Sequence, residues 1–269
     1  MADPMYRQIA EDLRRQIESG DLAPGSQLRT ELELREKYDA SRNTVRDAIK
    51  WLTTRGLVET RPGQGTFVVE KIDPFVTTLT DDPETGLGGG EGIFYTTEVE
   101  AGKRRPKSSD PRVEMQRADD RIADVLGVDA GAPIVSRHQQ RYIDDRPWSL
   151  QTSFYPMSLV EDGALRLIQA IDITEGTVPY LDKELHVRQV AYRDTITVRA
   201  PNEEETTFFK LPEDGRVAVF EIMRAAFDEK QKAFRLTVSV YPADRNQFVI
   251  NVGKVPPGFA NPPRREPTN

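Results

Sequence analysis

The chain opens with apolar positions at helical spacing. Ile9, Leu13 and Ile17 lie four residues apart, with polar positions between them, and predict one amphipathic helix. Residues 19–25 hold two glycines and a proline, which end that helix. Residues 184–198 alternate apolar and polar positions instead, which is typical of a strand. The two periods predict a helical first part and a strand-rich later part.

Two more helices and a hairpin follow the first helix. Thr30 and Glu33 have the spacing of a capping box and predict a second, short helix. Ser41 caps a third helix, which runs to about residue 55. Residues 56–70 predict two strands joined by the turn Pro-Gly-Gln-Gly. A helix-turn-helix followed by a hairpin predicts a winged helix.

The periodicity stops in the next segment. Residues 72–92 are rich in Gly, Asp and Pro and predict a flexible linker. Their glycines do not fit G-x-G-x-x-G, and no Gly-Lys-Ser/Thr follows, so a phosphate-binding loop is rejected. Residues 253–269 are rich in proline without periodicity and predict a disordered tail.

Residues 93–252 predict an α+β domain with a mixed sheet. Strands are expected at 93–101, 133–143, 148–156, 184–198, 217–228 and 233–241, and helices at 116–126, 161–170, 176–182 and after an Asn202 cap. The predicted organisation is therefore a winged helix over 1–71, a linker over 72–92, an α+β domain over 93–252 and the tail.

The third helix has one cationic face. Arg42, Arg46 and Lys50 recur every four residues, opposite the apolar positions of the same helix. Residues 41–65 hold five basic and two acidic residues, a net charge of +3 in a chain whose total is −7. Arginine can grip a phosphate or a guanine edge with two hydrogen bonds, and a helix N-terminus favours phosphate. A solvated helix face is the alternative, but the helix-turn-helix spacing and the glycine-containing wing favour DNA binding.

Residues 6–69 resemble the DNA-binding domain of the GntR family of bacterial transcription regulators. The resemblance rests on the run from Tyr-Arg-Gln-Ile to Pro-Gly-Ser-Gln-Leu, on Ser-Arg-Asn-Thr-Val-Arg, and on Gly-Gln-Gly-Thr-Phe-Val. It implies that Arg42, Thr44 and Arg46 contact operator DNA. Leu32 stands where the family has an arginine, for which Arg29 could substitute. The full set of predicted DNA-contacting residues is Arg29, Thr30, Ser41, Arg42, Asn43, Thr44, Arg46, Lys50, Arg61, Gly63, Gln64 and Gly65.

Residues 93–250 resemble the UTRA effector domain of the HutC-like group, through segments such as Arg-Tyr-Ile-Asp-Asp-Arg-Pro and Tyr-Pro-Ala-Asp-Arg-Asn-Gln-Phe. The resemblance implies a chorismate-lyase-like fold with a pocket for a small-molecule effector. Where the family has an Arg-x-Arg pair, this chain has Gln139 and Arg141. Where the family has a glutamate, this chain has Gln151, and where it has another acidic residue, this chain has Arg235. The predicted effector-binding residues are Gln139, Arg141, Gln151, Arg235 and Tyr241. For Arg141, a surface arginine on the strand or an ion pair with Asp144 is an equal alternative. Tyr142, Trp148 and Tyr241 could line a pocket, but aromatic residues on strands are more often core.

Composition narrows the function classes. The chain has no cysteine and two histidines, which excludes disulfides and cysteine-ligated zinc and disfavours a histidine-rich metal site. No apolar run approaches the roughly 20 residues that cross a bilayer, and no signal peptide precedes the first helix, so a cytoplasmic protein without membrane contact is expected. Neither an enzymatic motif nor a cofactor motif stands out.

These observations predict a transcription repressor that binds double-stranded operator DNA as a homodimer and responds to an unknown small-molecule effector. Two alternatives stay open. One is an effector-independent repressor, for example of plasmid transfer, because the expected pocket arginine is lost at Gln139 and an acidic position is Arg235. The other is a chorismate-lyase-like enzyme.

Overall fold

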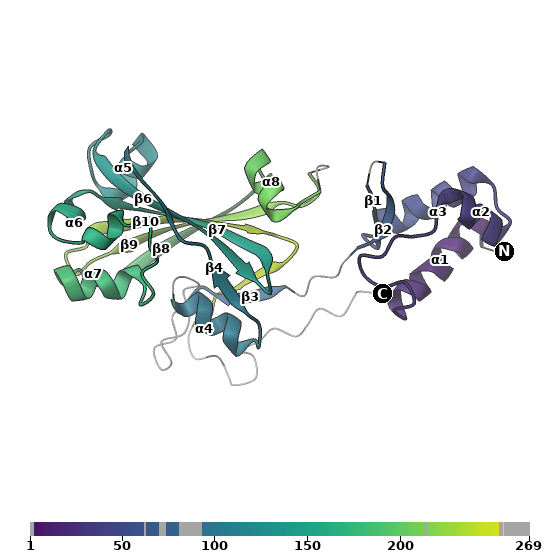
Figure 1. The fold of residues 1–269 in the computed structure, drawn as a ribbon, viewed down its shortest axis with the longest axis horizontal. Coiled ribbons are helices and arrows are strands. Elements are labelled where there is room, and N and C mark those ends of the chain that lie inside the picture. Colours follow the sequence, from purple (N-terminus) through teal and green to yellow (C-terminus); the bar gives the residue numbers. More distant parts are fainter. Residues whose placement is uncertain are drawn as a thin grey trace. The chain divides into compact units, whose positions relative to one another are not determined.

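The computed structural model describes residues 3–61, 63–69, 74–80, 93–212, 215–252 and 255. The chain divides into two compact units, residues 1–73 and 74–269 (Figure 1). The tail predicted over 253–269 lies outside the described residues apart from residue 255. Of the linker predicted over 72–92, residues 72–73 and 81–92 also lie outside the described residues.

The first unit is the predicted winged helix. It contains α1 (Met5–Glu18), α2 (Glu31–Tyr38), α3 (Arg42–Thr54), β1 (Val58–Arg61) and β2 (Gly65–Val68). The two strands pair antiparallel, from Val58 opposite Val68 to Arg61 opposite Gly65. The apolar stripes of the three helices meet in one core, whose buried members include Ile9, Leu13, Leu34, Val45 and Leu52.

Local signals fix the helix ends in this unit. The Thr30 hydroxyl accepts a hydrogen bond from the Glu33 N–H, and the Glu33 carboxylate accepts one from the Thr30 N–H, so the predicted capping box is confirmed. Asp39 ends α2 in the left-handed conformation at φ 47°. Ser41 then caps α3 by accepting from the Thr44 N–H. The turn between the two helices therefore follows from short-range side-chain chemistry.

The second unit is built on one antiparallel sheet of seven strands. The strand order is β4-β6-β7-β10-β9-β8, and β5 also pairs with β6. The strands are β4 (Pro106–Ser108), β5 (Arg112–Arg117), β6 (Pro133–Ile143), β7 (Arg146–Pro156), β8 (Ala191–Arg199), β9 (Val219–Phe227) and β10 (Ala233–Pro242). The helices are α4 (Ile93–Ala101), α5 (Asp120–Leu126), α6 (Ser158–Glu161), the 3-10 helix η1 (Leu165–Ile168), α7 (Thr177–Leu185) and α8 (Glu203–Phe209).

Helices cover both faces of this sheet, but mainly near its ends (Figure 1). On one face, called the α5/α8 face, α5 packs over Ile134 and Leu236, and α8 packs over Leu150 and Val240. On the other face, α6, η1 and α7 form an apolar cluster with sheet residues that include Val135. This second face also carries buried polar side chains, among them Gln151, Thr237 and Ser239.

The structure corrects the predicted linker at residues 74–80. Phe75–Thr78 form β3, which pairs in parallel with β11 (Asn246–Val249), the strand after the last strand of the main sheet. Phe75 and Leu79 are buried. The pairing partner lies 171 residues away in sequence, from Phe75 to Asn246, so local composition does not reveal it. A parallel pair occurs only here among the described strands, so the main sheet is antiparallel and not mixed.

Three further elements differ from the predictions. Residues 93–101 form a helix and not a strand, because the buried Tyr95 and Val99 lie four residues apart on one side. The helix expected at 161–170 is divided into α6 and η1, with Gly163 at φ 122° between them. The strand expected at 184–198 begins only at residue 191, because α7 continues to Leu185 and ends at His186 in the left-handed conformation.

Candidate nucleic-acid interface and effector face

The outer face of α3 carries the predicted DNA-contacting arginines. The buried face of the helix, with Val45, Ala48 and Leu52, fixes its rotation. Arg42 and Arg46 therefore project outward, with 62% and 54% of their side chains exposed. Ser41 and Thr44 are engaged with each other through their hydroxyls at 2.8 Å, so both lie at the capped N-terminus of this helix.

Glu31 lies between the two arginines, and its role was missed in the sequence. Arg46 donates from Nε to both Glu31 oxygens at 3.0 and 3.2 Å, and Arg42 donates from Nε to Oε2 at 3.2 Å. The hydrogen bond from Arg46, followed by that from Arg42, holds the pKa of Glu31 below its ordinary value. The terminal nitrogens of both guanidinium groups bond to none of the described residues, so Glu31 holds each group by its inner edge.

A sequence signal for Glu31 existed. It is the first residue of α2, directly after the cap residue Thr30, and acidic residues are favoured there by the helix dipole. That explanation is sufficient for a glutamate at this position. The contact with α3 depends on the angle between the two helices, which the spacing of 11 and 15 residues does not give.

The wing residues are held by contacts within the hairpin. Gln27 donates from Nε2 to the Gln64 carbonyl at 2.7 Å, which ties the turn to the segment before α2. Gly65 has φ 117°, and a Cβ there would lie 2.4 Å from the Gln27 amide nitrogen, so the position requires glycine. Gly63 also has positive φ, 70°. Arg61 bonds to Glu59 at 2.8 Å and lies over the Phe67 ring.

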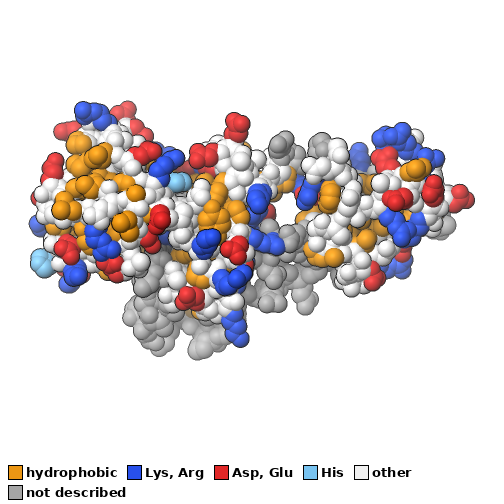
Figure 2. All heavy atoms as spheres, viewed as in Figure 1, with side chains coloured by type: hydrophobic (Ala, Val, Ile, Leu, Met, Phe, Trp, Pro, Cys, Tyr) orange, Lys and Arg blue, Asp and Glu red, His pale blue; other side chains and the backbone are white. Residues whose placement is uncertain are grey.

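A shallow groove of about 360 Å³ lies between α3 and the hairpin. Arg46 and Lys50 line it on the helix side, and Thr60 and Thr66 line it on the hairpin side. Figure 2 shows basic side chains gathered at one end of this unit, with acidic side chains among them. Of the other predicted residues, Arg29 and Asn43 are exposed, whereas the Thr30 side chain is occupied by its capping role.

The predicted effector residues lie on the sheet face opposite the α5/α8 face, which we call the effector face. Gln139 of β6 lies opposite Gln151 of β7, and Gln151 lies opposite Ser239 of β10. Tyr241 and Arg235 follow the alternation of β10 on the same side. The structure thus brings together residues that are separated by up to 102 positions in sequence. Arg141, Gln151, Arg235 and Tyr241 are all buried.

Several polar groups of the effector face are incompletely paired. The Arg141 guanidinium lies 4.8 Å from the centre of the Tyr95 ring, and among the described residues it makes no hydrogen bond or ion pair. Ser149 Oγ and Gln151 Oε1 are buried without a hydrogen-bond partner in the same part of the chain. Asp144 pairs with Arg104 at 2.8 Å, so the alternative ion pair between Arg141 and Asp144 does not form. Buried polar groups are normally bonded, which makes this face suited to a polar ligand.

Other predicted effector residues already have partners. Gln139 donates to the Ser109 carbonyl at 3.2 Å and to Asp172 at 3.0 Å, and Arg235 donates to Gln189 at 3.2 Å. Arg137, two residues before Gln139, was not predicted. It is buried and donates to the carbonyls of residues 166, 167, 169 and 171 at 2.8–3.0 Å. It therefore clamps η1 and the following loop onto the sheet.

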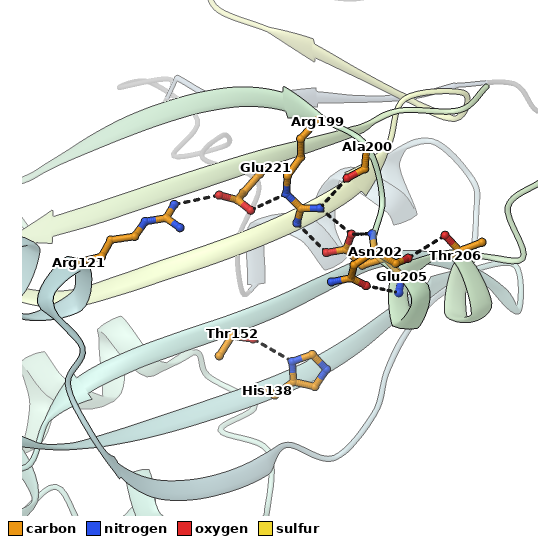
Figure 3. Close-up of polar contacts among 9 residues, drawn as sticks. All are labelled: Arg121, His138, Thr152, Arg199, Ala200, Asn202, Glu205, Thr206 and Glu221. Atoms are coloured by element: carbon orange, nitrogen blue, oxygen red, sulfur yellow. Dashed lines mark hydrogen bonds and ion pairs between the residues drawn. The ribbon is translucent and has the colours of Figure 1, made fainter. Parts of the chain in front are cut away.

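The α5/α8 face has a separate polar hollow of about 270 Å³, lined by sheet residues and by Glu204 and Glu205 of α8. Figure 3 shows Arg199 of β8 between Glu221 and Glu205, and Arg121 on the other side of Glu221. Burial alone would raise the pKa of Glu221, but hydrogen bonds from Arg121 and Arg199 outweigh it and lower that pKa. His138 bonds through Nδ1 to Thr152 at 2.8 Å, and burial lowers its pKa. The charged groups of this hollow are largely neutralised by one another.

Within the described residues, no three His, Asp or Glu side chains come together as a metal site. In the same part of the chain, no helix has both the length and the apolar character needed to span a membrane.

Comparisons with known proteins match both units. The family model for bacterial regulatory proteins, gntR family, matches residues 5–68, and the UTRA domain model matches residues 101–247. The HTH-type transcriptional regulator GgaR of Escherichia coli strain K12 is 25% identical over 246 residues, which cover 91% of this chain and 90% of GgaR. The transcriptional repressor NagR of Bacillus subtilis strain 168 is 24% identical over 247 residues, with coverages of 91% and 93%.

A third relative matches over a shorter region. The mannosyl-D-glycerate transport/metabolism system repressor MngR of Escherichia coli strain K12 is 30% identical over 162 residues, which cover 59% of this chain and 61% of MngR. Among solved structures, PhnF from Mycobacterium smegmatis has a TM-score of 0.56 at 23% identity and covers 91% of this chain and 98% of its own. That likeness shows a shared fold.

Proposed function

The chain belongs to the GntR family of bacterial regulatory proteins and carries a UTRA domain, and from this premise we propose that it is a repressor whose operator binding is controlled by a small molecule. Like its relatives GgaR, NagR and MngR, it is a transcription regulator and not an enzyme. We also propose a location in the bacterial cytoplasm, where operator DNA lies.

The observation that carries the proposal is the arrangement of Arg42 and Arg46. Both are exposed on the N-terminal half of α3, and Glu31 holds both by Nε. Their terminal nitrogens remain available for a guanine edge or a phosphate. Lys50 and Arg61 extend the basic surface to the groove and the hairpin. A single such unit recognises one half-site, so we propose a homodimer on an inverted repeat.

The experiment is binding of the purified full chain to DNA from its own upstream region, with a random duplex as reference, at several salt concentrations. The proposal predicts preferential binding to a short inverted repeat. It also predicts that affinity falls steeply with salt, since each phosphate contact releases about one counterion. Equal affinity for both duplexes would contradict sequence-specific binding.

For the effector we propose a hydroxylated molecule with at least one negative charge. The Arg141 guanidinium lacks a counter-charge among the described residues, and Ser149 Oγ and Gln151 Oε1 offer unused polar atoms nearby on the same face. The relative MngR is named for mannosyl-D-glycerate, a molecule of this chemical class. The unpaired groups favour this proposal over an effector-independent repressor, because they offer a polar ligand a positive charge and hydrogen-bonding atoms on one face.

A thermal-shift screen with sugar acids and sugar phosphates tests this proposal. A ligand that binds the native state raises the melting temperature with concentration, by mass action. We expect Arg141→Gln to abolish the shift, and Arg112→Gln, an exposed arginine on the neighbouring strand, to leave it unchanged. A shift that survives Arg141→Gln would place the effector elsewhere.

A further inference from the structure

The two edges of the seven-stranded sheet are built differently. One edge is formed by β4 and β5, which are three and six residues long. Pro106 and Lys107 lie on β4, and Arg112, Glu114 and Arg117 on β5. Short strands, prolines and charged side chains are the features that prevent an exposed edge from pairing with another chain. This edge is therefore protected.

The other edge, β8, is longer and holds no proline. Its nine residues, Ala-Tyr-Arg-Asp-Thr-Ile-Thr-Val-Arg, contain no proline and no lysine. It pairs with β9 without a bulge, from Ala191 opposite Phe227 to Arg199 opposite Val219. Its centre is β-branched and exposed, with 40% of Ile196 and 60% of Val198 accessible. No described strand pairs with its outer side.

Two of the three charged side chains of β8 are neutralised inside their own sheet. Asp194 forms two hydrogen bonds of 2.7 Å with Arg224 of β9. Arg199 bonds to Glu221 and Glu205, as Figure 3 shows. Arg193 is exposed and forms no ion pair within the described residues. The outer side of β8 thus presents unpaired backbone groups with little repelling charge, which is the surface that adds a strand.

We propose that β8 pairs antiparallel with β8 of a second copy of this chain, about a two-fold axis at Thr195, so that two seven-stranded sheets become continuous. The inference rests on the homodimer of the proposed function and names its interface. A two-fold interface brings the same surface of both copies together, so the strand must be complementary to itself.

The sequence of β8 meets that requirement in one long register. With the axis at Thr195 all nine residues pair, Tyr192 lies opposite Val198 of the second copy, and no like charges are opposed. An axis at residue 193 or 194 would place Arg193 or Asp194 opposite its own copy, and an axis at Ile196 would oppose Arg193 and Arg199. An axis at residue 197 would pair only five residues. Opposed like charges destabilise a strand pair, so the Thr195 register is favoured.

A single cysteine tests the interface, because the chain has none of its own. In the proposed register Thr195→Cys lies opposite its own copy. The Cα atoms of directly opposed residues are roughly 4.5–5.5 Å apart, within the range that a disulfide spans. Under mild oxidation we expect a covalent dimer that forms at least about tenfold faster than with Met115→Cys. Met115 is 71% exposed on the protected edge and serves as the matched control.

A charge pair at position 197 provides a second, independent readout. Residue 197 would lie opposite Arg193 of the second copy, twice per dimer. We therefore expect Thr197→Glu to lower the dimer dissociation constant and Thr197→Lys to raise it, each by about threefold or more, as measured by sedimentation. Within its own sheet residue 197 lies opposite Glu221, so the effects on the fold of one copy have the opposite sign. Altered folding therefore cannot imitate the expected result.

The possible outcomes test the β8 interface and the homodimer separately. A wild-type chain that sediments as a monomer at micromolar concentration would overturn both. A wild-type dimer in which Thr195→Cys fails to cross-link, or in which Met115→Cys cross-links as fast, would overturn the β8 interface and leave the homodimer standing. Rapid Thr195→Cys cross-linking with opposite effects of the two residue-197 variants would support the proposal.

Discussion

The two units of this protein use arginine in opposite ways. In the N-terminal unit, Arg42 and Arg46 are exposed, share one carboxylate and leave their terminal nitrogens available. In the C-terminal unit, Arg137 and Arg141 are buried on one face of the sheet. Among the described residues Arg137 bonds to backbone carbonyls alone, while Arg141 lies against the Tyr95 ring. Exposed guanidinium groups suit a long polyanion, and buried ones suit the ordering of a loop or the binding of one small anion.

The two pairs of arginines also differ in how far apart in sequence the segments that position them lie. The exposed pair is positioned by segments close in sequence, namely two helix caps and the turn between them. The buried pair depends on strands that come together from across the whole domain. We therefore expect some substitutions to change the stability of the C-terminal unit alone, and others to change DNA binding by the N-terminal unit alone.

The largest expected effect is on the stability of the C-terminal unit. Arg137→Met removes the donors of four carbonyl groups, three of them bonded to a single nitrogen. Unpaired buried carbonyls are costly, so we expect a loss of about 3 kcal/mol in the free energy of unfolding of this unit. Differential scanning calorimetry measures it. Arg112→Met, on the neighbouring strand and exposed, should cost less than about 0.5 kcal/mol. Equal losses would show that Arg137 does not clamp the loop.

A smaller effect is expected on DNA selectivity, and it would sharpen the contrast. Glu31→Gln removes a negative charge beside Arg42 and Arg46 and weakens their positioning. Binding to random DNA should strengthen, because one charge that repels phosphate is gone. The preference for the operator should fall by about tenfold, because the two guanidinium groups lose their fixed orientation. Affinities for both duplexes, measured at one salt concentration, give the ratio. An unchanged ratio would mean that Glu31 does not position the arginines.

The smallest expected effect is a pH dependence in the C-terminal unit. Burial, the largest influence, raises the pKa of Glu98 to about 7, and the hydrogen bond from the Thr78 N–H only partly opposes it. Since the folded state holds this proton more tightly than the unfolded state, the stabilisation is full below about pH 4.5 and is lost as pH rises through about 7.

Glu98→Gln should remove this part of the pH dependence. The variant should be more stable than the wild type at pH 8 by about 1 kcal/mol, a value reduced for partial solvent screening, and the difference should shrink toward pH 5. Taking the difference between the two proteins cancels the opposite contribution of His138, whose pKa is lowered by burial. Denaturant unfolding at several pH values measures the difference in the free energy of unfolding between the two proteins. A difference that is the same at pH 5 and pH 8 would refute the assignment of this pH dependence to Glu98.

The N-terminal unit was largely predictable from sequence because its determinants are local. The capping box at Thr30, the cap at Ser41 and the glycine turn of the hairpin each lie within a few residues. The contact of Glu31 with α3 was not predictable, because it depends on the packing angle of two helices. In the C-terminal unit, the paired strands β6 and β7 were predicted from their sequences.

Long-range pairing explains what the sequence did not reveal in the C-terminal unit. β3 was predicted as linker because its partner β11 lies at the far end of the domain. Residues 93–101 were predicted as a strand because aromatic and β-branched residues favour strands, but packing of Tyr95 and Val99 against the sheet unit made them helical. The effector residues were named through a resemblance; their common face follows from strand register, and their binding role remains a proposal.

The most direct test of the central claim compares Arg46→Ala with Arg15→Ala in operator binding by the full chain. Arg15 is a more exposed arginine, 71% accessible on α1, and controls for the loss of one positive charge. If α3 recognises the operator, Arg46→Ala should weaken operator binding by about 100-fold and erase the preference over random DNA, while Arg15→Ala should change it by less than about threefold. Equal, small losses in both variants would contradict the assignment of α3 as the recognition helix.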